Sequence, residues 1–273
     1  MKFGTLNLIS TLEECEAKFK RLHDLGMEAC HLVYKPEKFT KEASDRIRSC
    51  AEKYEIDICA QFAGFRDGEI NWDDLRFTQK TAGLGVPAYR MERIRYVKET
   101  IDFAAMTGIP QIIIHAGFIP YDTFSETYAD ILTAVVSVAK YAKTKNIEVL
   151  LETGMETPIT MLGFIKDTGM DNVFINFDPA NILMYGYGNP VDALKIFGPY
   201  VKNMHGKDGC LPTVPHRLGD EKKVGEGMVD FPAIFKILKE IGYDRYCVIE
   251  REIGGDQQIR DILDAKEYLQ GLL

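Results

Sequence analysis

Short apolar, β-branched runs alternate with amphipathic stretches along the whole chain. Such runs are typical of strands buried in a parallel sheet. Eight strands are predicted, at residues 2–8, 29–34, 57–62, 111–115, 148–152, 173–177, 201–205 and 246–250. Apolar residues at helical spacing predict helices between them, at residues 12–25, 41–54, 91–107, 125–145, 231–241 and 257–269, with two weaker ones at 161–167 and 191–197. The chain therefore reads as a series of strand–helix units.

Strands that alternate with helices pair in parallel through right-handed crossovers. Eight such units in 273 residues are about what a closed (β/α)8 TIM barrel needs. An open doubly wound sheet would have a glycine-rich turn after the first strand, and GTLNLIS is not such a turn. Because no repeat or linker divides the chain, we expect a single TIM-barrel domain over residues 1–273, with its active site at the C-terminal mouth.

Two predicted connections are long, residues 64–89 and residues 206–229, and the first contains the only tryptophan, Trp72. In a barrel both follow strands at the C-terminal mouth, where catalytic loops lie. Long loops at such places are commonly functional. We therefore expect the two connections to act as lids over the site.

Four predicted strands, the fifth to the eighth, end in a residue that can bind a metal ion: Glu152, Asp178, His205 and Glu250. A barrel brings the ends of neighbouring strands around one point. A single acidic strand end usually forms an ion pair or faces solvent, but four in register favour a shared metal site. Three carboxylates and an imidazole suit Mn²⁺, which we favour, or Mg²⁺ or Co²⁺, better than a structural Zn²⁺ site. We expect one divalent ion, with Zn²⁺ as a further alternative.

Other polar residues near the predicted mouth fit a pocket for a sugar. His115 ends the fourth strand, and Asn181 lies one turn beyond Asp178. Lys207 and Asp208 follow the predicted imidazole ligand, and we expect them to orient it or to bind a substrate hydroxyl. Three less specific candidates for the substrate pocket are Glu156, Gln61 and Arg217.

The net charge is -8 and the isoelectric point is about 5.3. This balance disfavours nucleic acid and anionic membranes, whose binding depends on clustered lysine and arginine. We find neither a signal peptide nor an apolar run long enough to span a membrane. The six cysteines form no CxxC pair, which favours reduced thiols in the cytoplasm.

Six short motifs occur in order along the chain: HAG at 115–117, LETG at 151–154, NFDPAN at 176–181, HGKDG at 205–209, GEGMVDFP at 225–232 and IEREIGG at 249–255. This series resembles the sugar phosphate isomerase/epimerase superfamily, the xylose-isomerase-like TIM barrels. The resemblance implies that the four strand-end residues bind Mn²⁺ or a related ion and that Glu152 and Glu250 act as the acid/base pair. Sugar epimerases of the group often carry histidine at the position of Asn181, so the resemblance does not transfer a substrate.

The expected function is isomerisation or epimerisation of a sugar, sugar phosphate or keto-polyol through an enediolate. A lyase or dehydratase acting on a keto-sugar, keto-inositol or 3-keto-glycoside would use the same site. A nuclease of the endonuclease IV type would need more than the five histidines present and a basic surface. A non-catalytic sugar-binding barrel would not need two glutamates beside an open metal position. The expected partners are the small-molecule substrate and, by default, further copies of the chain.

Overall fold

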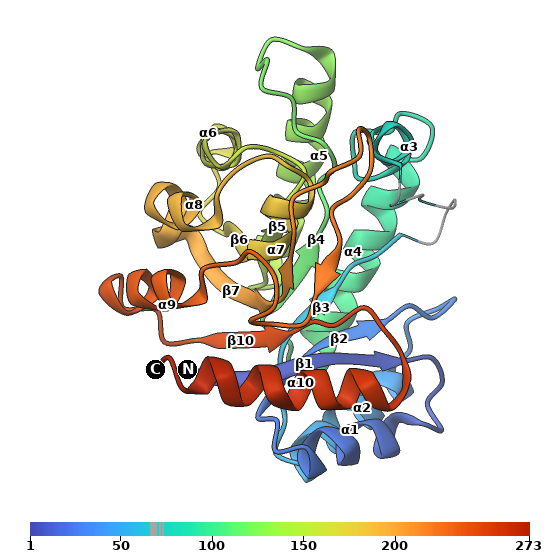
Figure 1. Ribbon diagram of the computed structural model, residues 1–273. Coiled ribbons are helices and arrows are strands. Elements are labelled where there is room, and N and C mark those ends of the chain that lie inside the picture. Colours follow the sequence, from blue (N-terminus) through green and yellow to red (C-terminus); the bar gives the residue numbers. More distant parts are fainter. Residues whose placement is uncertain (66–69, 71, 73) are drawn as a thin grey trace.

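The computed structural model describes residues 1–65, 70, 72 and 74–273. Its centre is a closed barrel of parallel strands (Figure 1). The order around the barrel is β1 (Lys2–Ile9), β10 (Tyr246–Ile249), β7 (Val201–Gly206), β6 (Val173–Phe177), β5 (Glu148–Glu152), β4 (Gln111–Ile114), β3 (Asp57–Phe62) and β2 (Ala29–Tyr34). The predicted (β/α)8 fold is confirmed, and each predicted strand agrees with the observed one to within one residue at either end.

The connecting helices surround the barrel (Figure 1). They are α1 (Cys15–Asp24), α2 (Lys41–Lys53), α4 (Arg90–Thr107), α5 (Glu126–Thr144), α6 (Pro158–Thr168), α8 (Pro190–Phe197), α9 (Phe231–Glu240) and α10 (Gly255–Gln270). Short elements that were not predicted are α3 (Leu75–Thr81), α7 (Pro179–Met184), the 3-10 turn η1 (Gly198–Tyr200) and the pair β8 (Asp208–Gly209) and β9 (Glu221–Lys222). Each is too short to show a helical or strand period in the sequence.

The space between barrel and helices is filled by apolar side chains such as Phe103, Phe164 and Phe177, all fully buried. The inside of the barrel is different, because a layer of buried polar side chains crosses it below the mouth. Asn203 donates a hydrogen bond to Gln111 (3.2 Å), and Gln111 donates one to Glu148. Gln111 and Glu148 are the first residues of β4 and β5, so this polar layer lies toward the end of the barrel opposite the mouth.

The two long connections meet over the mouth of the barrel. The Leu75 N–H donates a hydrogen bond to the carbonyl oxygen of His216 (2.9 Å), and Asp74 and Arg217 form an antiparallel bridge. In the first connection, residues 66–69, 71 and 73 lie outside the described part. The connections are therefore placed where lids would lie, and their movement stays a prediction.

Five of the six cysteines are buried, and all six are free thiols. Burial raises the pKa of Cys247 to about 12, and the same cause raises the pKa of Cys59 to about 12. These two thiols therefore stay protonated and pack as small apolar groups. Among the described residues, every helix is too short or too polar to cross a lipid bilayer.

Candidate metal centre and active site

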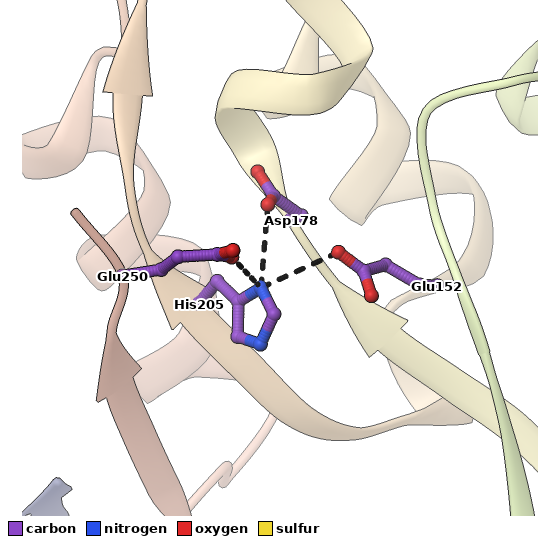
Figure 2. Close-up of side chains that lie close together, drawn as sticks. All are labelled: Glu152, Asp178, His205 and Glu250. Carbon is purple, nitrogen blue, oxygen red and sulfur yellow. Dashed lines mark hydrogen bonds and ion pairs between the residues drawn. The ribbon is translucent and has the colours of Figure 1, made fainter. Parts of the chain in front are cut away.

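The four strand-end residues converge on one point. One ligand atom from each of Glu152, Asp178, His205 and Glu250 lies within 4.8 Å of the others. The Nδ1 atom of His205 is 2.8 Å from a Glu250 oxygen, 3.3 Å from an Asp178 oxygen and 3.5 Å from a Glu152 oxygen. Figure 2 shows the three carboxylates directed at this one ring nitrogen. We call these four residues the quartet.

The barrel explains the convergence. Glu152 is the last residue of β5, His205 lies at the end of β7, and Asp178 and Glu250 directly follow β6 and β10. These four strands are neighbours in the closed sheet, so their carboxyl ends share one rim. Asp178 is fixed further because it caps α7, accepting a hydrogen bond from the Asn181 N–H (2.9 Å).

Burial and the nearby charges shift the pKa values of the two glutamates of the quartet in opposite directions. Burial, together with the charges of Glu250 and Asp178, raises the pKa of Glu152 well above its usual value. Burial also acts on Glu250, but the charges of Lys207 and His205 outweigh it and lower its pKa. One Glu152 oxygen is buried without a hydrogen-bond partner among the described residues, and the buried Glu250 oxygen there has the His205 ring nitrogen beside it at 2.8 Å. A divalent cation would satisfy these oxygens and favour the ionised state of every carboxylate, so the donor set fits such an ion.

The far side of the His205 ring is held from within the barrel. Its Nε2 atom lies 3.1 Å from Nδ1 of His31 on β2 and 3.2 Å from the amide nitrogen of Asn176 on β6. All three side chains are fully buried. A histidine that binds a metal through one ring nitrogen is oriented by the hydrogen bond of the other. The geometry therefore assigns Nδ1 of His205 to the quartet and Nε2 to its support.

A cavity of about 510 Å³ adjoins the quartet. Among the described residues, Glu152 and Glu250 line it, whereas Asp178 and His205 do not. The two glutamates are thus in reach of both a metal ion and a molecule in the cavity. A ligand there could present a carbon-bound proton to either carboxylate.

Three of the predicted substrate residues, His115, Asn181 and Lys207, also line this cavity. His115 Nε2 is 3.6 Å from a Glu152 oxygen, and burial lowers the pKa of His115 to about 4. The imidazole is therefore neutral near pH 7 and can donate or accept a hydrogen bond. Asn181 donates one to the other Glu152 oxygen (3.2 Å), so it orients that carboxylate.

Lys207 brings a positive charge to the Glu250 side of the cavity. Its Nζ is 2.5 Å from a Glu252 oxygen, 3.6 Å from a Glu250 oxygen and 3.9 Å from an Asp178 oxygen. Burial lowers the pKa of Lys207, but the carboxylates of Glu250, Asp178 and Glu252 outweigh it and raise the pKa well above its usual value. The ammonium group stays charged and can donate hydrogen bonds to a ligand oxygen.

Asp208, predicted to orient His205 or to bind a substrate hydroxyl, instead accepts hydrogen bonds from backbone groups of its own loop. Its side chain is buried, and its carboxylate accepts hydrogen bonds from the backbone N–H groups of Gly209, Gly225, Gly227 and Val229, at 2.8 to 3.1 Å. It is not among the described residues that line the cavity. This placement makes Asp208 the anchor of the loop after β9 and does not support a contact with substrate.

Glu156, Arg217 and Gln61 also lie apart from the cavity lining. Glu156 lines a separate cavity of about 370 Å³, where burial raises its pKa to about 8. Arg217 is exposed on the outer loop. Gln61 is buried, and because Phe62 lines the cavity, the alternation of a strand turns Gln61 to the opposite face. The structure does not bring these three side chains into the predicted pocket.

Glu252 and Phe62 line the cavity but were not predicted to do so. For Glu252 a signal was present in the sequence, because this second glutamate lies only two residues after Glu250, just beyond the end of β10. Trp72 lines the cavity as well, with its ring 5.5 Å from that of His115. Its position confirms that the 64–89 connection reaches the mouth.

Sequence comparison finds an uncharacterized protein of Methanocaldococcus jannaschii that is 25% identical over 294 residues, covering 100% of this chain and 89% of the relative. Inosose dehydratase of Clostridium botulinum is 31% identical over 113 residues, which is 37% of each chain. Among solved structures, a xylose isomerase domain protein from Planctomyces limnophilus is 33% identical, with a TM-score of 0.90 over 99% of this chain and 96% of that one.

A D-tagatose 3-epimerase-like protein superposes with a TM-score of 0.73 at 22% identity, covering 100% of this chain and 97% of that one. At this identity the likeness shows the fold alone. The sequence model of the xylose isomerase-like TIM-barrel family matches residues 19–271 of this chain. The chain therefore belongs to the xylose isomerase-like TIM-barrel family.

Proposed function

We propose that the protein is a divalent-metal-dependent isomerase or epimerase of a keto-sugar or keto-polyol, with Mn²⁺ as the favoured ion. The observation that carries the proposal is the arrangement of the quartet. All four residues can hold one ion, yet the cavity is lined only by the two glutamates among them. Both carboxylates thus face the place where a substrate carbon would lie.

The ion, when bound, polarises the substrate carbonyl and stabilises the negative charge that develops on its oxygen. One glutamate removes the proton from the neighbouring carbon, and the same or the other glutamate returns it. Return to the opposite face of that carbon is epimerisation, and return to the adjacent carbon is isomerisation. Asn181 holds Glu152 through its hydrogen bond. Lys207 beside Glu250 and the neutral His115 can donate hydrogen bonds to substrate oxygens.

The similarity to inosose dehydratase favours one alternative on the same site. After the same proton is removed, the intermediate would expel a hydroxyl group from the next carbon as water. Mass spectrometry of the product distinguishes the two reactions, because a dehydratase product is lighter by one water and an epimerised or isomerised product keeps the mass of the substrate.

The binding of metal is the first test. We expect one Mn²⁺ per chain and a rise in the melting temperature on Mn²⁺ addition, since a ligand at 100 times its Kd stabilises the folded state by about 2.7 kcal/mol. Calorimetric titration of the chelator-treated protein and thermal unfolding measure both. Deuterium uptake from D₂O into added ketoses and keto-inositols should require the ion. A protein that binds no divalent ion would contradict the proposal.

Replacing His31 with leucine is expected to weaken Mn²⁺ binding about 10- to 100-fold, because His205 loses the group 3.1 Å from its Nε2. His31→Asn should restore part of the affinity, since an amide can occupy the place of the ring nitrogen. Calorimetric titration gives the Kd, and His23→Leu, on the exposed face of α1, is the matched control. An unchanged Kd in His31→Leu would show that the contact does not orient the ligand.

A further inference from the structure

We infer that the protein has a second binding site, separate from the metal centre, for a primary ammonium group attached to a small apolar body. The site is the cavity of about 370 Å³ that Glu156 lines, where the connections after β4 and β5 meet α3 and the start of α6. The inference goes beyond the proposed function and does not depend on it. It is based on a buried carboxyl group that lies among aromatic rings and has no cation beside it in the described lining.

The carboxyl group of Glu156 is buried without a compensating charge. The residue is 5% exposed, and it is the only charged residue among the described residues that line the cavity. A hydrogen bond from the Gly154 backbone lowers its pKa, but burial outweighs it and raises the pKa to about 8. The nearby Thr157 and Thr160 hydroxyls lie 2.7 Å apart and bond to each other. Because an ionised carboxylate is costly to bury without a partner, a cationic ligand would stabilise it.

Three aromatic side chains, Phe118, Tyr121 and Tyr187, line the same cavity. The ring centroids of Phe118 and Tyr187 are 6.3 Å apart, and Tyr121 is 81% exposed, so its ring lies at the open rim. The two tyrosines are also the only titratable side chains besides Glu156 in the described lining. The faces of aromatic rings attract cations electrostatically. Rings and carboxyl group therefore both favour a positively charged ligand.

The rest of the lining specifies the body of the ligand. Ile119, Pro120 and Met155 are apolar, and Gln79 and Thr127 add uncharged polar groups. At the ~30 Å³ of a liquid water molecule for each atom, the cavity has room for about twelve non-hydrogen atoms. An ammonium group with one short alkyl chain or one phenyl ring fits this space. A primary ammonium is favoured over a quaternary one because its three N–H groups can donate hydrogen bonds to the carboxylate.

The site is distinct from the cavity at the quartet. Among the described residues, none lines both cavities. Aromatic contact separates them, because the ring of Phe118 in this cavity packs edge-on at 5.9 Å against the ring of Tyr185, which lines the other. Met155 packs in the same apolar cluster as Tyr185. The ammonium compound therefore binds while the quartet holds its own cation.

The test is calorimetric titration with phenethylamine and with phenethyl alcohol, its uncharged counterpart of the same size. Mn²⁺ is present throughout, so that the carboxylates of the quartet do not compete for the amine. We expect the amine to bind about 10-fold or more tightly than the alcohol, because only the amine forms charge-assisted hydrogen bonds. Its affinity should rise about 10-fold for each pH unit below pH 8, as the ionised fraction of Glu156 rises. Binding at pH 7 should release about one proton.

Variants assign the binding to this cavity. Glu156→Gln should weaken amine binding about 10-fold or more and abolish its pH dependence, and Tyr187→Leu should weaken it about 3- to 30-fold. Glu126→Gln, exposed at the start of α5, is the matched control and should bind as the wild type does. Absence of amine binding, equal binding of the alcohol, or a wild-type Kd in Glu156→Gln or Tyr187→Leu would overturn the inference. The titration needs no turnover, so each of these results leaves the proposed function to its own tests.

Discussion

Glu152→Gln and Glu250→Gln are each expected to lower metal-dependent deuterium exchange about 10²- to 10⁴-fold at saturating Mn²⁺. The substitution keeps the size of the side chain and one oxygen that can bind a metal ion, but the amide cannot accept the substrate proton. Both positions matter because both glutamates line the cavity, whereas the other two quartet residues do not. Exchange is measured by NMR of the substrate in D₂O.

Two further measurements separate loss of chemistry from loss of metal. The Mn²⁺ Kd of each variant shows the concentration at which the site is saturated, so the rates are compared between loaded proteins. Glu240→Gln, exposed at the end of α9, is the matched control and should exchange at the wild-type rate. If one glutamine variant exchanges normally when loaded, that glutamate is only a ligand and the other carries both proton transfers.

Asp208→Asn is expected to lower the free energy of unfolding by about 3 kcal/mol, a value that corresponds to losing two hydrogen bonds to a charged acceptor. Each carboxylate oxygen accepts two backbone N–H groups, so an amide nitrogen in place of either oxygen faces two donors. The loop also needs glycine at position 227, because a Cβ there would lie 2.1 Å from an Asp208 carboxylate oxygen.

Urea unfolding measures this effect, with Asp220→Asn as the control because Asp220 is exposed in the same connection. The control should unfold at the wild-type urea concentration. Asp208→Asn should also reduce turnover, since the anchored loop follows the segment that carries Lys207 and Leu218 into the cavity. Wild-type stability in Asp208→Asn would show that the four hydrogen bonds are not what holds the loop.

The strands and the quartet could be predicted because both depend on local patterns. In the run EVLLE at 148–152 the apolar residues mark the buried part of the strand, and Glu152 comes where the strand ends. The carboxyl ends of parallel strands share one rim of a barrel, so such residues can be assigned to the same site. Asn181 and Lys207 were found for the same reason, since each lies within a few residues of a strand end. His115 follows β4 in the same way.

The four residues placed elsewhere show where local patterns stop being informative. Gln61 and Phe62 are adjacent in a strand, so only one of them can face the cavity. In the structure Phe62 lines the cavity and Gln61 does not. Asp208 lies one residue from Lys207, yet its carboxylate is turned to backbone groups 17 to 21 positions later in the chain. Glu156 and Arg217 lie in connections between regular elements. The path of a connection cannot be predicted from the spacing of its hydrophobic residues.

The sequence by itself thus determined the barrel, its strand boundaries and the four residues at neighbouring strand ends, because strand length, burial and side-chain alternation are properties of consecutive residues. Only the tertiary structure decided which polar side chains share a cavity, that His31 lies beside His205, and that apolar side chains such as Leu6 and Met184 line the same cavity. Those facts depend on contacts between strands and loops far apart in the chain. Their geometry is set by barrel closure and loop packing, which no stretch of consecutive residues encodes.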